Sequence, residues 1–226
     1  MPQQRWPSQA SSFQAFSGDG QTVAYTAAAS STGGSPGVTN LYLKHLRDGQ
    51  IWTVDRWNGG NVSLSRDGRL VAYDSEIDVP LLGDSNGSYD VFVWDRQTGV
   101  RELVSRTGNR SGNSSSGNSF ISASGRFVVF STDATDLFAG DVNGQRDILL
   151  RDRQLGSTRV ISANAAGSIG NGFSDDAVVS ENGQYVAFMS GSGNLTADPN
   201  PNAYQIYLRD WVNNTVVRVS AFPNGV

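Results

Sequence analysis

The 226-residue chain has no cysteine and a single histidine. The lack of cysteine excludes disulfide bonds and thiolate metal sites, although it leaves the cellular compartment undecided. Charged residues are sparse as well, at 17% of the chain, and the net charge is -4 at pH 7. A nucleic-acid surface needs clustered Lys and Arg to neutralise phosphates, so we expect no nucleic-acid partner.

Long apolar runs are also missing. No stretch approaches the roughly 20 apolar residues that span a bilayer as a helix, so we expect no membrane insertion. Residues 1–7 (MPQQRWP) have no apolar core, and we expect no signal peptide in this chain. Helical spacing of apolar residues is absent too, which predicts almost no helix. Gly, Ser and Asn separate short apolar runs instead, as is typical of many short strands joined by turns.

The dominant feature of the sequence is a fourfold internal repeat. A Ser-initiated turn followed by an alternating apolar strand occurs at residues 17–25, 65–73, 122–130 and 180–188. Three of these turns contain Asp-Gly or Asn-Gly, which supply the positive φ that a two-residue hairpin demands. Each copy continues through a loop into a second alternating strand, which begins at Leu41, Val91, Ile148 or Ile206. Self-similarity at a period of roughly 45 to 60 residues indicates a repeat architecture.

Each repeat can be divided into four antiparallel strands, which predicts the blade of a β-propeller. In the third copy we expect strands at residues 119–123, 126–132, 147–151 and 158–162. The repeats lack the helical segment of leucine-rich solenoids, and a β-helix would use shorter coils. We therefore predict one all-β domain over residues 1–226, a β-propeller of four blades at about 9–57, 58–107, 108–164 and 165–222.

The loops of such a blade are predicted to divide between two faces. Loops after the second and fourth strands leave on one face, and the tight hairpins leave on the other. The long loops 27–40, 75–89, 133–146 and 191–204, with the crossings 112–118 and 167–176, all belong to the first face. We expect the hairpin face to be flat and the loop-bearing face to bind.

Two motifs give the chain a family resemblance. They read SRDGRLVAY at residues 65–73 and GDSNGSYDVFVWD at 83–95, and the second returns at 140–152. With them the chain resembles the TolB-like β-propellers of bacteria, which carry WD40-like (PD40) repeats. The resemblance implies an extracytoplasmic protein, periplasmic or secreted, that binds rather than catalyses. Such proteins usually have six or more blades. A closed four-blade ring, a homodimer of eight blades and a piece of a larger protein therefore all stay open.

The second motif places oxygen donors at alternate positions of two loops. Calcium prefers six to eight oxygen ligands at about 2.3 to 2.6 Å, in a loop that Gly allows to bend. The candidate calcium ligands are Asp84, Asn86, Asp90, Asp141, Asn143 and Asp147. These loops are shorter than an EF-hand and lack its terminal Glu. The competing interpretation is that Asp and Asn cap turns by accepting backbone N–H groups.

Other candidate residues have simpler interpretations. His45 occupies the position of Asp95, Asp152 and Asp210 in the other repeats, which indicates a substitution within a structural repeat rather than a catalytic base. The Gly-x-Ser-x-Gly pattern at 33–37 is spurious, because Pro36 has no N–H for an oxyanion hole. Trp57, in a short crossing, is the candidate for stacking on a sugar, and packing is the alternative.

These observations predict a non-catalytic scaffold that binds a protein partner through its acidic, loop-bearing face. The alternative is a small-ligand binder that uses the same face, either lectin-like or loaded with Ca²⁺. A hydrolase is a distant third, because no nucleophile, base and orienting group occur in a recognisable pattern.

Overall fold

The computed structural model describes residues 12–28, 39–197 and 204–220. These residues form an all-β fold, and their helical structure is one short turn, η1 (Pro80–Leu82). Their strands form four four-stranded antiparallel sheets and one two-stranded ribbon. The all-β prediction is confirmed. Within the described part of the chain, no helix has the length and apolar character needed to cross a membrane.

Each sheet consists of four strands that follow one another along the chain. The first sheet contains β1 (Ser12–Phe16), β2 (Thr22–Ala28), β3 (Thr39–His45) and β4 (Ile51–Trp57). The second contains β5 (Val62–Leu64), β6 (Leu70–Ser75), β7 (Asp90–Asp95) and β8 (Arg101–Leu103). The third contains β11 (Ser116–Ile121), β12 (Phe127–Thr132), β13 (Asp147–Asp152) and β14 (Ser157–Val160). The fourth contains β15 (Ser174–Val179), β16 (Tyr185–Ser190), β17 (Gln205–Asp210) and β18 (Thr215–Arg218). The ribbon pairs β9 (Arg106–Thr107) with β10 (Arg110–Ser111).

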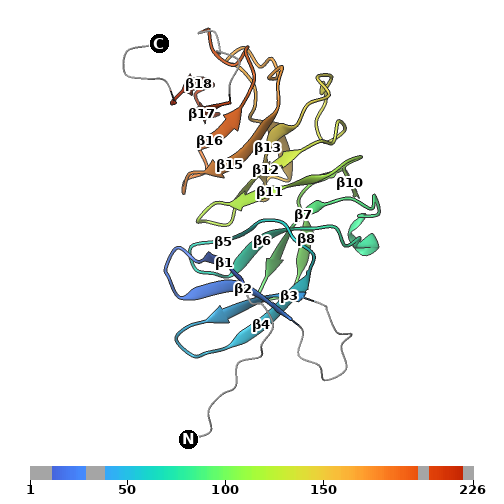
Figure 1. Ribbon diagram of the computed structural model, residues 1–226, viewed down its shortest axis with the longest axis vertical. Coiled ribbons are helices and arrows are strands. Elements are labelled where there is room, and N and C mark those ends of the chain that lie inside the picture. Colours follow the sequence, from blue (N-terminus) through green and yellow to red (C-terminus); the bar gives the residue numbers. More distant parts are fainter. Residues whose placement is uncertain (1–11, 29–38, 198–203, 221–226) are drawn as a thin grey trace, which may run out of the picture.

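The sheets succeed one another along the long axis of the molecule (Figure 1). The first sheet lies at one end and the fourth at the other, so the described sheets form an open arc. The closed ring of four blades, one of the arrangements that the sequence left open, is therefore not formed. Three hydrophobic clusters lie between successive sheets and hold the arc together.

The repeated serine explains why each sheet begins with a tight hairpin. Its hydroxyl oxygen accepts a hydrogen bond from the backbone N–H five residues later, over 2.9 to 3.1 Å, at Ser17, Ser65, Ser122 and Ser180. The glycine three residues after each serine has a positive φ, between 61° and 77°. The predicted tight hairpin between the first and second strands is confirmed in all four repeats. In the third repeat the first strand begins at Ser116, three residues earlier than expected.

The hairpin face is not flat, contrary to the prediction. A hollow of about 590 Å³ lies between the turns of the second and third sheets. Its walls include the ion pairs Arg69–Asp95 (2.7 Å) and Arg153–Glu102 (2.8 Å). The prediction failed because it considered only the short turns and not the long arginine side chains that stand beside them.

Candidate binding site at the bulges of the first strands

The first strands of the third and fourth sheets each contain a β-bulge, where the pairing register shifts inside β11 and inside β15. Asn118 and Asp176 occupy these bulges with φ of 50° and 54°. Such left-handed backbone is unfavourable for residues other than glycine, by roughly 1 to 3 kcal/mol, and bulges commonly redirect a side chain. The surrounding contacts must therefore hold both residues in place.

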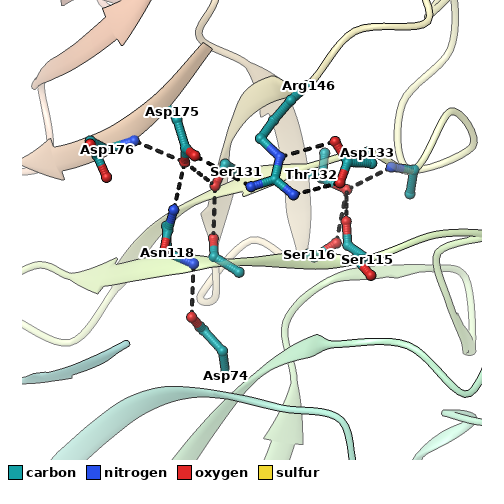
Figure 2. Close-up of polar contacts among 12 residues, drawn as sticks. Asp74, Ser115, Ser116, Asn118, Ser131, Thr132, Asp133, Arg146, Asp175 and Asp176 are labelled. Atoms are coloured by element: carbon teal, nitrogen blue, oxygen red, sulfur yellow. Dashed lines mark hydrogen bonds and ion pairs between the residues drawn. The ribbon is translucent and has the colours of Figure 1, made fainter. Parts of the chain in front are cut away.

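Asn118 is held from two neighbouring sheets (Figure 2). Its backbone N–H donates to Oδ2 of Asp74, in β6, over 2.8 Å. Its side-chain Nδ2 donates to Oδ1 of Asp175, in β15, over 2.8 Å. Asp74 also accepts the backbone N–H of Asn61 (2.9 Å) and the hydroxyl of Ser119 (2.6 Å). Asn118 thus connects the second, third and fourth sheets.

Asp175 connects this network to the loop between β12 and β13 (Figure 2). It accepts the hydroxyl of Ser131 over 2.6 Å, and Arg146 Nη1 lies 3.3 Å from its Oδ2. Arg146 forms a closer ion pair with Asp133, with Nη2 2.5 Å from Oδ2. The neighbouring Asp176 is exposed. We call the set Asp74, Asn118, Asp133, Arg146, Asp175 and Asp176 the polar rim.

The two buried carboxyl groups of the polar rim differ in their pKa. Burial raises the pKa of Asp74 to about 6, although Ser119, Asn61 and Asn118 donate hydrogen bonds that favour the ionised form. Burial also opposes ionisation of Asp175, but hydrogen bonds from Asn118 and Ser131 outweigh it and lower its pKa. The rim therefore contains a fixed negative charge at Asp175 beside a carboxyl group that titrates near pH 6.

The two loops that contain the candidate calcium ligands, residues 83–90 and 140–147, share one geometry, and we call them the acidic loops. Asn86 Nδ2 donates to Asp90 Oδ2 (2.8 Å) and to the carbonyl oxygen of Gly112 (2.9 Å), while its Oδ1 accepts the N–H of Ser88. The second loop repeats all three bonds with Asn143, Asp147, Gly170 and Gln145. Each asparagine caps its own turn and fastens the loop to the following crossing, which supports the capped-turn interpretation.

The carboxylates of these loops are less completely bonded. Ser105 donates to Asp90 Oδ1 over 2.5 Å, and burial together with Asp84 raises the pKa of Asp90 to about 7. Oδ1 of Asp84 and Oδ1 of Asp141 are buried without a hydrogen-bond partner. Among residues 12–28, 39–197 and 204–220, no cluster of three or more His, Cys, Asp or Glu side chains is arranged to hold a metal ion.

The two remaining candidates of the sequence have structural surroundings. Trp57 is partly buried and packs against the hydrophobic cluster between the first and second sheets. His45 pairs with Thr22 across the sheet as Asp95 pairs with Leu70, and its Nδ1 lies 2.9 Å from Asp48 Oδ1. The Gly-x-Ser-x-Gly pattern at 33–37 lies outside the described residues.

The polar rim was not predicted from the sequence. The segments around it were recognised only as Asn- and Ser-rich crossings. A usable signal is the break in strand alternation at SGNSF (116–120) and SDDAV (174–178), where polar residues interrupt a first strand at the same point of two repeats.

Antiparallel four-stranded sheets packed face to face in an arc define a β-propeller fold. No protein-family model matches the sequence, and no curated protein matches it. Solved structures do share its fold. TolB from Acinetobacter baumannii aligns with a TM-score of 0.59 at 18% identity, over 96% of this chain and 47% of that one.

Two further structures show how widely this fold is used. The β-propeller domain of the Trilobed protease from Pyrococcus furiosus aligns with a TM-score of 0.58 at 11% identity, over 92% of this chain and 56% of that one. An oligogalacturonate lyase in complex with manganese gives a TM-score of 0.53 at 12% identity, over 92% of this chain and 52% of the lyase. The chain thus has the β-propeller fold of TolB-like proteins and spans about half the length of these three structures.

Proposed function

We propose that this protein is a non-catalytic scaffold that binds a protein partner through its loop-bearing face. The polar rim carries this proposal, because hydrogen bonds to Asp74 and Asp175 fix the bulge at Asn118, and Asp176 is exposed at the equivalent bulge of the fourth sheet, where its N–H donates to Asp175. Rigid polar groups on a repeat scaffold lower the ordering entropy that binding would otherwise lose. The likeness to TolB supports a binding role and an extracytoplasmic location, periplasmic or secreted.

The partner that suits this face has a basic surface. Residues 75–90 contain Glu76, Asp78, Asp84 and Asp90 but no Lys or Arg. Residues 133–147 contain four Asp against the single cation Arg146. Glu76, Asp78 and Asp133 are exposed, so they contribute directly to the field that a partner meets. Complementary charge at the edge of an interface chiefly raises the association rate and the specificity of binding.

The Pyrococcus protease and the lyase are enzymes, so the fold alone does not decide against catalysis. The proposal rests on the residues at the site. The polar rim consists of carboxylates, an asparagine and an arginine that is already paired with Asp133. The one histidine, His45, lies at the hairpin end of β3 and bonds to Asp48. Ser105 and Ser119 donate to Asp90 and Asp74, but both serines are 0% exposed, so neither hydroxyl is accessible to a substrate.

Two matched charge reversals test the assignment of the face. On the loop side, Glu76→Arg with Asp78→Arg reverses an exposed Glu and an Asp that accepts the N–H of Gly87. On the hairpin side, Glu181→Arg with Asp48→Arg reverses an exposed Glu and an Asp that accepts the N–H of Gln50. The immobilised proteins are incubated with a bacterial envelope extract. We expect one defined protein to be retained by the wild type and the hairpin-side variant but not by the loop-side variant. Equal retention by both variants would contradict the proposal.

A second candidate function, Ca²⁺ binding, has one observation in its favour. Oδ1 of Asp84 and Oδ1 of Asp141 are buried without a partner, in two loops of the same design. Asp84, Asn86 and Asp90, and Asp141, Asn143 and Asp147, are the groups that would hold the ions. Against it, each asparagine donates Nδ2 to the aspartate that would be its co-ligand. The lectin-like alternative has no comparable support, because Trp57 packs on the first hydrophobic cluster.

A thermal melt in EDTA and then in millimolar Ca²⁺ tests this second candidate. A ligand at about 100 times its dissociation constant stabilises the folded state by roughly 2.7 kcal/mol, which raises the midpoint by several degrees. We expect the rise to disappear in the double variant Asp84→Asn, Asp141→Asn. An unchanged midpoint on adding Ca²⁺ to the wild type would leave both loops as capped turns.

A further inference from the structure

Each of the first three sheets presents an equivalent apolar face to the sheet that follows it. In the third strand of the first three repeats, Leu41, Val91 and Ile148 are 0% exposed. Ile206 occupies the same position in the fourth sheet, because it pairs with Met189 as Ile148 pairs with Ser131. Ile206 is nevertheless 40% exposed. The fourth sheet therefore carries the covered face of the other sheets without its cover.

The fourth strands show the same contrast. The backbone N–H of Val104 donates to Val91, and that of Ile161 to Ile148, and both side chains are 0% exposed. Val219 donates to Ile206 in the same way but is 50% exposed. Cross-strand pairing places four further apolar residues of this face in one row, Val178, Ala187, Leu208 and Val217. We call the set Val178, Ala187, Ile206, Leu208, Val217 and Val219 the tail face.

The first sheet carries the opposite half of such an interface. In the second and fourth sheets a stacked aromatic pair packs on the preceding sheet, as Phe188 and Tyr207 do with ring centroids 5.9 Å apart and 1% of each residue exposed. Tyr25 and Tyr42 form the equivalent pair in the first sheet, with centroids 5.5 Å apart. Both are only partly buried, and so is Val23 beside them. We call Val23, Tyr25 and Tyr42 the head face.

Charge does not prevent the head face from packing. Lys44 pairs with Val23 in the first sheet, at the position of Arg151 in the third sheet and Arg209 in the fourth. Both arginines are buried where those sheets pack on their predecessors, at 6% and 5% exposure. A long cationic side chain at this position is thus compatible with a closed interface between sheets.

We propose that the head face of one copy packs on the tail face of a second copy, and reciprocally, so that two chains close into one propeller. The inference rests on the interface between the third and fourth sheets, where Phe188 and Tyr207 pack on aliphatic side chains of the third sheet. An aromatic head face on an aliphatic tail face would repeat that contact. The two faces lie at opposite ends of the arc, so one chain does not join its own (Figure 1). Two copies of four sheets give a ring of eight blades, within the range of about 4 to 8 typical of propellers.

Mass in solution, measured by light scattering across a concentration series, tests the proposal. We expect the wild type to have twice the chain mass of 24.1 kDa. Ile206→Lys on the tail face and Tyr42→Lys on the head face should each yield monomers. Leu155→Lys replaces a turn leucine that is 69% exposed and lies on neither face, so it should remain dimeric. Mixing the tail and head variants should restore a weak dimer, because one interface of the pair is then intact.

Three results would overturn the proposal. The first is a wild-type monomer at every concentration. The second is a ladder of larger species, because a head-to-tail contact that does not close produces open filaments. The third is a dimer that Ile206→Lys dissociates but Tyr42→Lys leaves intact, which would indicate tail-to-tail pairing. Val217→Lys serves as a second tail variant, and circular dichroism verifies that each variant is folded.

Discussion

The backbone N–H of Asn118 lies 2.8 Å from Oδ2 of Asp74, and this hydrogen bond joins the bulge in β11 to the neighbouring second sheet. Asp74 is 2% exposed and accepts two further bonds, from Asn61 and Ser119. At pH 4, before ionisation weakens the wild type, we expect Asp74→Asn to lower the free energy of unfolding by about 1 to 3 kcal/mol, because an amide has one oxygen to accept bonds that two carboxyl oxygens accept here. Urea denaturation of the purified variant measures the loss. An unchanged midpoint would mean that the bulge does not depend on this carboxyl group.

The same variant predicts a pH dependence with a definite sign. Burial raises the pKa of Asp74 from 3.8 to about 6, so between these values the folded state binds more protons than the unfolded chain. The wild type should therefore lose stability relative to Asp74→Asn as the pH rises from about 4 to about 6. Asp175 has a lowered pKa, and its stabilisation should disappear as the pH falls below 3.8. Opposite slopes for Asp74→Asn and Asp175→Asn are the expected outcome, and parallel slopes would contradict it.

Asn118 provides a test of the bulge itself. Replacement by Gly or by Ala removes the same Nδ2 bond to Asp175. Alanine must also adopt a φ of 50°, which glycine does without strain. We expect Asn118→Ala to be less stable than Asn118→Gly by about 1 kcal/mol. Equal unfolding free energies in guanidinium chloride would show that the bulge relaxes when its side chain is lost.

Two glycines of the first acidic loop separate backbone strain from close packing. Gly83 and Gly87 have φ of 81° and 66°, so a side chain strains either position. A Cβ on Gly83 would lie 1.8 Å from the carbonyl oxygen of Asn109, whereas a Cβ on Gly87 meets nothing within 4 Å. We expect Gly87→Ala to cost about 1 kcal/mol and Gly83→Ala several times more. Thermal melts measure both losses, and equal melting points would exclude the packing argument.

Gly83→Ala should also have a local signature. The carbonyl oxygen of Gly83 accepts the N–H of Ser111, in β10, over 3.0 Å. Displacing Asn109 therefore disturbs the ribbon formed by β9 and β10. Hydrogen exchange should accelerate at Ser111 in Gly83→Ala and stay unchanged in Gly87→Ala. Uniform acceleration along the chain would instead indicate a loss of global stability.

The features predicted from the sequence are those whose chemistry is local. The hairpin at Ser17 needs only its hydroxyl, a glycine and the N–H of Thr22, five residues away. Asn118, in contrast, depends on Asp74, 44 residues before it, and on Asp175, 57 residues after it. No pattern within one repeat contains that information, so the crossings were recognised and the polar rim was not.

The acidic loops show the same limit. The spacing of Asp84, Asn86 and Asp90 correctly places oxygen-bearing side chains in one turn. It does not show which way the amide of Asn86 faces, because that is set by the carbonyl oxygen of Gly112, 26 residues away. The flat hairpin face was predicted wrongly for a related reason, since the hollow depends on arginines from two different sheets.

Ile148 and Ile206 allow one substitution to be compared at equivalent positions of two sheets. Ile148 is 0% exposed beneath the fourth sheet, so Ile148→Ala should lower the free energy of unfolding by about 2 to 5 kcal/mol at any protein concentration. Ile206 is 40% exposed on the tail face, and in dilute solution Ile206→Ala should cost less than half as much. If a second copy covers the tail face, assembly stabilises the wild type by mass action, and the cost of Ile206→Ala grows with protein concentration. Denaturation at two widely separated concentrations measures this difference. A cost at Ile206 that stays small and constant would mean that the tail face remains open to water.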